Sequence, residues 1–175
     1  MSDGPMDQDF SGSCAVTSRK PLMRDLPYGR NSDRSDWRLV LTEQRGTCST
    51  KHVLLAELAR ENGRPVALVL GVYEMDGENT PGVGEVLREH GLRCVPEAHC
   101  YLLAHEDTRV DLTRESEGAE QAKRFLHQEE IEPHQIGRYK VEAHQDFVRR
   151  WAGRRGLDPE SVWRAREECI AALAE

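Results

Sequence analysis

The sequence lacks the features of a membrane or secreted protein. No apolar run approaches the roughly 18 residues that a bilayer-spanning helix needs, and no secretory hydrophobic segment opens the chain. None of the five cysteines, at positions 14, 48, 94, 100 and 169, lies in the CxxC spacing of a zinc knuckle or a redox motif. We therefore expect a soluble cytoplasmic protein with reduced thiols, in which each cysteine is either a small buried residue or a reactive one.

The sequence also lacks an excess of positive charge. Its 24 basic and 31 acidic side chains give a formal net charge of -7. Residues 46–136 hold 9 Lys and Arg against 17 Asp and Glu, whereas both flanks are close to neutral. Because an acidic centre repels phosphate backbones, we expect neither nucleic acid nor a membrane as a partner.

The chain divides into an arm and one domain. Residues 1–35 are rich in Ser, Asp, Gly, Arg and Pro without periodicity, which is typical of a flexible tail or of an arm laid loosely over the domain. Residues 36–175 are long enough to bury a core of their own, and we expect a single domain that ends in a helical part. No internal repeat or low-complexity tract is visible.

Helix and strand signals predict an α+β fold, in which a cysteine-bearing helix packs on a small antiparallel sheet and C-terminal helices cover the remainder. The segment 36–44 is ambiguous between helix and strand. Helices are expected over 48–62, over 81–90 with Thr80 as the cap, over about 116–130 and 141–153, and from Asp158 onward. Strands are expected over 65–73, 96–104 and 109–113, and the last two are joined as a hairpin.

Cys48 stands where a thiol becomes reactive. Thr47 or Gly46 would cap the helix that follows, which places Cys48 in its first turn. The positive end of a helix stabilises a thiolate, and the N–H groups there can receive the oxyanion of a tetrahedral intermediate. The alternative is a buried structural thiol, the usual role of a cysteine.

The hairpin carries two polar side chains in otherwise apolar strands. With a turn at 105–108, residues of the two strands pair when their numbers sum to about 213. His99 and Asp111 are therefore not directly opposite but lie diagonally across the two strands. Side chains on a diagonal of one face can meet, and an aspartate there would hold the imidazole tautomer and stabilise an imidazolium beside Cys48. Alternatively, His99 is a core histidine and Asp111 a strand-end residue.

The segments GTCSTKH, PEAHCYLL and RVDLT, in this order, resemble the transglutaminase-like branch of the papain-like cysteine enzymes. The resemblance covers roughly residues 45–113. It implies a catalytic triad of Cys48, His99 and Asp111 that transfers acyl groups through a thioester, without a cofactor, from a peptide, protein or small amide substrate. The family commonly places an aromatic residue after the histidine, whereas Cys100 follows here.

Three further residues are candidates for the oxyanion site or the substrate cleft. Gln44 stands four residues before the cysteine, His52 shares its helix face, and Glu97 points to the same strand face as His99. His52 could instead bind a metal with Cys48 or act as another base. A zinc site that uses Cys94, Cys100 and His99 lacks finger-like spacing.

Two other functions remain open at this point. One is a catalytically inactive transglutaminase-like module that binds a peptide or protein in the same cleft. The other is an acyltransferase that moves acyl groups from coenzyme A to an amine, for which the sequence offers no recognisable nucleotide pocket. The residues indicate neither the substrate nor the oligomeric state.

Overall fold

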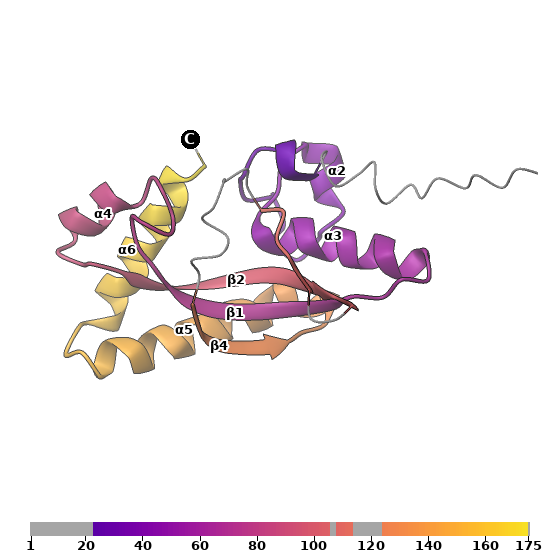
Figure 1. Cartoon of the computed structure of the whole chain (residues 1–175). Helices are drawn as coiled ribbons and strands as arrows, with labels where there is room; N and C mark the ends of the chain where they lie inside the picture. Colours follow the sequence, from indigo (N-terminus) through magenta and orange to yellow (C-terminus); the bar gives the residue numbers. More distant parts are fainter. Residues whose placement is uncertain (1–22, 106–107, 114–123, 175) are drawn as a thin grey trace, which may run out of the picture.

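A four-stranded antiparallel sheet forms the centre of the fold. The computed structural model describes residues 23–105, 108–113 and 124–174 (Figure 1). The sheet order is β3-β2-β1-β4, and the strands are β1 (Ala67–Met75), β2 (Val95–Ala104), β3 (Thr108–Val110) and β4 (Phe125–Glu130). Together with the helices, this sheet confirms the α+β fold with C-terminal helices.

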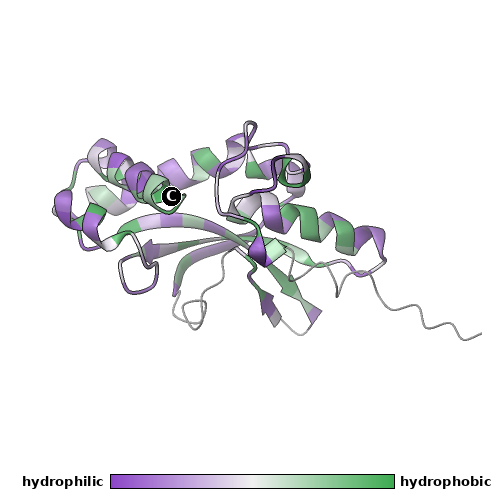
Figure 2. Ribbon diagram, turned by 90° about the horizontal axis from the view of Figure 1, so that it is seen from above, coloured by the Kyte–Doolittle hydropathy of each residue, from purple (hydrophilic) through white to green (hydrophobic). Residues whose placement is uncertain are grey.

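The helices gather on one side of the strands (Figure 2). They are α2 (Leu39–Glu43), α3 (Cys48–Glu61), α4 (Gly84–Glu89), the 3-10 helix η3 (Pro133–Ile136), α5 (Arg138–Gly153) and α6 (Pro159–Ala172). Helix α3 lies over one end of the sheet and α6 over the other (Figure 1). None of the helices in the described ranges combines the length and the apolarity that crossing a membrane requires.

Two apolar cores follow from the alternation of side chains along β1 and β2. In the first, α3 packs on the face that carries Leu68, Leu70, Val72, Ala98, Cys100 and Leu102. In the second, α4, α5 and α6 enclose the other ends of the two strands around Tyr73, Met75, Val95, Trp151 and Cys169. Because the two cores share β1 and β2, the sheet joins the cysteine helix to the C-terminal helices.

Most elements lie where the sequence predicts them, but two do not. Helix α4 begins at Gly84 rather than at Pro81. The Asp76 carboxylate accepts the N–H groups of Glu78 and Asn79, and Gly82 has a positive φ of 104°, so the chain up to Gly82 forms a loop. The helix predicted over 116–130 is wrong in its second half, where β4 pairs with β1, and residues 114–123 lie outside the described residues.

Residues 23–35 lie over the domain as an arm. Met23 is buried in the first core, and Tyr28 forms a parallel bridge with Gly46. The Asn31 amide donates to the carbonyl of Arg45, and its oxygen accepts the hydroxyl of Thr50. Since these bonds reach the start of α3, the arm borders the segment that carries the cysteine; residues 1–22 lie outside the described residues. The ambiguous segment 36–44 contains the short helix α2.

Candidate active site

Cys48 is the first residue of α3, as the capping signals predict. Thr47 is the N-cap: its hydroxyl accepts the N–H of Thr50, and the Thr50 hydroxyl accepts the N–H of Thr47 in return. Gly46 leaves no room for a side chain, since a Cβ there would lie 2.9 Å from a methyl group of Val40. Cap and close packing together fix the sulfur at the positive end of the helix.

His99 and Asp111 meet across the hairpin. The observed register pairs Leu102 with Val110, so Asp111 continues opposite Tyr101 and lies diagonal to His99. The His99 Nε2 nevertheless lies 2.5 Å from Asp111 Oδ2. The other carboxylate oxygen accepts the hydroxyl of Thr113 at 2.6 Å, which holds the aspartate in place.

The Cys48 sulfur reaches both His99 and Cys100, although these neighbours point to opposite faces of β2. Strand β3 pairs with residues 102–104 of β2 and not with these two residues. A hydrogen bond from Cys100 is the largest effect that holds the pKa of Cys48 well below its usual value. Burial opposes it, and the charge of Lys140 and the ring of His99 lower this pKa further. The structure therefore brings Cys48, His99 and Asp111 together around a thiol that favours its ionised form.

Lys140 is a site residue that the sequence analysis missed. Its ammonium nitrogen lies 3.6 Å from the Cys48 sulfur and 2.6 Å from the Ser49 hydroxyl oxygen. Burial lowers the pKa of this lysine, but the thiols of Cys100 and Cys48 outweigh that effect and the pKa is raised. A lysine in the first turn of an amphipathic helix usually faces solvent, so nothing in the local pattern around residue 140 indicates this role.

His52 is committed to two backbone hydrogen bonds. Its Nδ1 lies 2.7 Å from the carbonyl oxygen of Cys48, and its Nε2 accepts the N–H of Leu112 at 2.9 Å. A carbonyl only accepts and an N–H only donates, so the ring carries its proton on Nδ1. Burial lowers the pKa of His52 and favours this neutral form. His52 therefore positions Cys48 and the strand end next to Asp111, rather than serving as a base.

Gln44 and Glu97 lie in different surroundings. Gln44 is exposed in the left-handed conformation after α2, and its amide donates to the Leu41 carbonyl instead of facing the sulfur. Glu97 is buried and held by two hydrogen bonds, of 2.6 and 2.9 Å, from Arg166 of α6. This ion pair lines the cavity beside Cys48, so Glu97 belongs to the site and Gln44 does not.

A cavity of about 60 Å³ adjoins the sulfur. Its walls come from the arm, the first turn of α3, α5 and α6, and its polar lining is Tyr28, Arg30, Arg34, Thr47, Cys48, Ser49, Glu97, Lys140, His144 and Arg166. Cys48 is 3% exposed, so the arm and the helices nearly cover the thiol.

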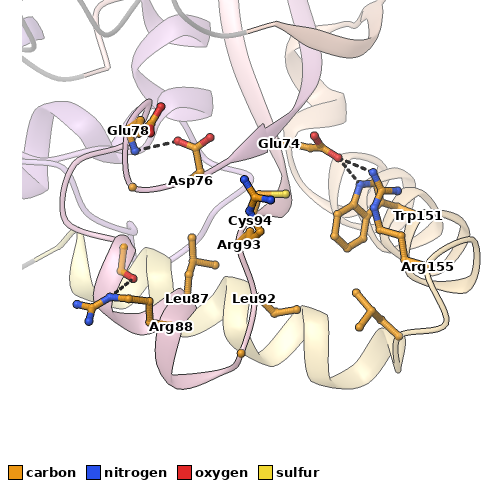
Figure 3. Close-up of a pocket in the computed structure, with 14 residues that line it drawn as sticks. Glu74, Asp76, Glu78, Leu87, Arg88, Leu92, Arg93, Cys94, Trp151 and Arg155 are labelled. Atoms are coloured by element: carbon orange, nitrogen blue, oxygen red, sulfur yellow. Dashed lines mark hydrogen bonds and ion pairs between the residues drawn. The ribbon is translucent and has the colours of Figure 1, made fainter.

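A larger cavity, of about 760 Å³, lies away from this centre, near α4 and the end of α5 (Figure 3). Its wall includes Trp151 and Arg155, which both donate to the Glu74 carboxylate at 2.8 Å. The half-buried Cys94 also lines it, and burial raises the pKa of that thiol. Cys48 and Cys94 thus each line a cavity, but of these two thiols it is Cys48 that has a histidine and a lysine next to its sulfur.

Within the described ranges, no three His, Cys, Asp or Glu side chains form a group that could hold a metal ion. Comparison of the chain with protein-family models, with curated proteins and with solved structures found no match in any of the three. The transglutaminase-like resemblance therefore has no support beyond the residues of this chain.

Proposed function

We propose that the protein is a thiol-dependent acyl-transfer enzyme that acts on an amide or ester through a thioester on Cys48. The observation that carries this proposal is the placement of Cys48 at a capped helix start, with its pKa lowered, beside a histidine that Asp111 holds at 2.5 Å. Each group has a separate role in the reaction.

In the first step, the Cys48 thiolate attacks the carbonyl carbon of the substrate. The N–H groups of Cys48 and Ser49 precede the first hydrogen bonds within α3, so they are placed to receive the oxyanion. Lys140 adds a positive charge 3.6 Å from the sulfur. The tetrahedral intermediate then expels the amine or alcohol and leaves a thioester.

His99 moves the proton in both steps. Because Nε2 faces Asp111, Nδ1 is the ring nitrogen that serves the sulfur and the leaving group. The imidazolium gives its proton to the departing amine or alcohol, and the neutral ring then takes a proton from the water or amine that attacks the thioester. The products are the acyl acid or a new amide, together with the free thiolate.

The direct test is acyl-enzyme formation with small 4-nitrophenyl esters and anilides, followed by nitrophenol or nitroaniline release and by the intact mass of the protein. We expect the wild type and Cys94→Ala to release product and to gain one acyl group, since Cys94 lines the distant cavity. Cys48→Ala should do neither. Release by the wild type and Cys48→Ala at the same rate as in buffer alone would contradict the proposal and favour a module that only binds.

A further inference from the structure

We propose that the cavity beside Cys48 selects acyl substrates that carry a carboxylate close to the reacting carbonyl, and that Lys140 binds this carboxylate. The inference rests on the proposed acyl-transfer function and names its substrate class. It is drawn from the charges that line the cavity, from their existing partners and from the change in charge when the sulfur is acylated.

Positive charge predominates in the lining. Four basic residues face the cavity, Arg30, Arg34, Lys140 and Arg166, against one carboxylate, that of Glu97. Glu97 is bound by Arg166, and the Arg30 guanidinium lies 2.7 Å from Glu167. Each of the two ion pairs, Arg166–Glu97 and Arg30–Glu167, has no net charge. Lys140 and Arg34 are therefore the cations that face a ligand.

The anionic group that Lys140 contacts directly is the Cys48 thiolate, which the reaction consumes. The Glu97 carboxylate also raises the pKa of Lys140, but it is held by Arg166. In the resting protein its ammonium lies 3.6 Å from the Cys48 sulfur and donates to the Ser49 hydroxyl. When the sulfur becomes a thioester, the negative charge of the thiolate is lost. Lys140 is half-buried, and a cation in that position is costly without an anionic partner. A carboxylate on the acyl group would restore the balance in the acyl-enzyme.

The size of the cavity restricts how that carboxylate is attached. The cavity is small, about 60 Å³, and a carboxylate is a small anionic group that suits it. Because Lys140 lies so close to the sulfur, the carboxylate must be separated from the reacting carbonyl by a short chain. Half-amides and half-esters of short dicarboxylic acids, such as succinate, have this form.

His144 closes the wall of the cavity without adding a charge near neutral pH. Its Nε2 faces the carbonyl oxygen of Pro96 at 2.8 Å. Burial is the main reason that the pKa of His144 falls to about 4. The sign of the cavity therefore depends on its lysine and arginines and not on this histidine.

Alkylation by a charged and a neutral reagent of nearly equal shape tests the anion site without requiring turnover. Iodoacetate and iodoacetamide differ at the group next to the reacting carbon, and labelling of Cys48 is followed by peptide mass mapping. We expect the ratio of iodoacetate to iodoacetamide labelling in the wild type to be at least tenfold higher at Cys48 than at Cys94 in the same sample. Lys140→Met should reduce this ratio at least fivefold. Part of the preference for iodoacetate should remain, because a protonated His99 also attracts the anion.

Two variants separate a local from a general effect of charge. Arg138→Met removes one positive charge two residues earlier in α5, from an exposed side chain paired with Glu142, and should keep the wild-type ratio. Lys140→Arg keeps the charge and should retain most of the preference. If Lys140→Met unfolds at the same temperature as the wild type and keeps its ratio of iodoacetate to iodoacetamide labelling at Cys48, the inference is overturned.

The substrate class is then tested with the succinic acid mono-4-nitroanilide and its neutral succinamide analogue. We expect kcat/KM of the wild type to favour the charged anilide by tenfold or more, and Lys140→Met to lose that factor. If both anilides react equally through Cys48, the inference fails while the proposed function stands. If neither reacts but alkylation prefers iodoacetate through Lys140, the proposed acyl transfer fails while the anion site stands.

Discussion

His52 and Leu112 join the cysteine helix to the strand end that carries Asp111. The His52 Nε2 accepts the backbone N–H of Leu112 at 2.9 Å, while Nδ1 lies 2.7 Å from the carbonyl oxygen of Cys48. One buried ring therefore links two candidate catalytic residues that are 63 positions apart. This arrangement makes the geometry of the site depend on a residue that does not itself face the sulfur.

Replacement of His52 by alanine should lower the free energy of unfolding by about 2–5 kcal/mol, because two buried backbone groups lose their partner and a cavity forms. Urea denaturation followed by circular dichroism measures the change. The matched control is His134→Ala at an exposed position, where a change within about 0.5 kcal/mol is expected. A similar small loss in His52→Ala would show that water replaces the ring without cost.

His144 should make the fold sensitive to acid. Its pKa is about 4 in the folded protein, mainly through burial, against about 6.5 in an unfolded chain. The unfolded state therefore binds more protons between these values, and this contribution to stability is present above pH 6.5 and lost as the pH falls toward 4. The loss amounts to roughly 3 kcal/mol.

The measurement for this prediction is the free energy of unfolding in urea at pH values from 4 to 8. In His144→Gln the decline between pH 6.5 and 4 should be shallower than in the wild type, and in His134→Gln it should be unchanged. Parallel curves for the wild type and His144→Gln would show that the histidine titrates alike in the folded and unfolded states.

Asp111→Asn should slow the alkylation of Cys48 at pH 6 by tenfold or more. An amide cannot stabilise an imidazolium at His99, so the thiolate loses part of the support that lowers its pKa, and the midpoint of the rate–pH profile should move upward. Iodoacetamide labelling with peptide mass mapping provides the profile. Glu89→Gln, a matched change at an exposed position, should leave it unaltered. An unchanged profile in Asp111→Asn would indicate that the aspartate only anchors the hairpin.

The helix start at Cys48 and the proximity of His99 to Asp111 could be predicted because their determinants are local, whereas the approach of Cys48 to His99, 51 positions later, has no local determinant. A Gly-Thr-Cys start identifies the first turn of a helix, and a four-residue turn determines which strand positions meet. The predicted register is wrong by one residue, because Ala104 pairs with Thr108 and the numbers of paired residues sum to 212 rather than 213. Asp111 therefore lies opposite Tyr101, on the same face as His99. Their chemical roles stay predictions.

Lys140 and Arg166 could not be predicted in the same way. Lys140 meets the sulfur from a helix 92 positions later, and Arg166 reaches Glu97 across 69 positions. No short-range pattern specifies which exposed-looking cation of an amphipathic helix turns inward. The error over 116–130 has a similar cause: Phe125–Glu130 is a polar segment without a strong strand signal, and its pairing with β1 decides its conformation.

Gly71→Ala should lower the free energy of unfolding by about 1–3 kcal/mol, because the central strand has no room for a side chain there. A Cβ at Gly71 would lie 2.5 Å from two ring carbons of Phe125. That ring stacks on Tyr101 with centroids 5.1 Å apart, and Arg109 lies 4.7 Å from each of the two ring centroids, so it cannot move aside cheaply. Urea denaturation of Gly71→Ala and of the control Gly153→Ala, whose Cβ would meet no atom within 4 Å, gives the comparison.

The double variant Gly71→Ala with Phe125→Leu identifies the cause of the loss. If the clash with the ring produces it, the two changes should destabilise the protein by less than the sum of the single changes, since the smaller side chain makes room for the methyl group. The control Gly153→Ala should be neutral or slightly stabilising, because alanine restricts the unfolded chain. Strict additivity would mean that Gly71 is needed for its backbone and not for the ring, and the stacked aromatic face would then tolerate a side chain on β1.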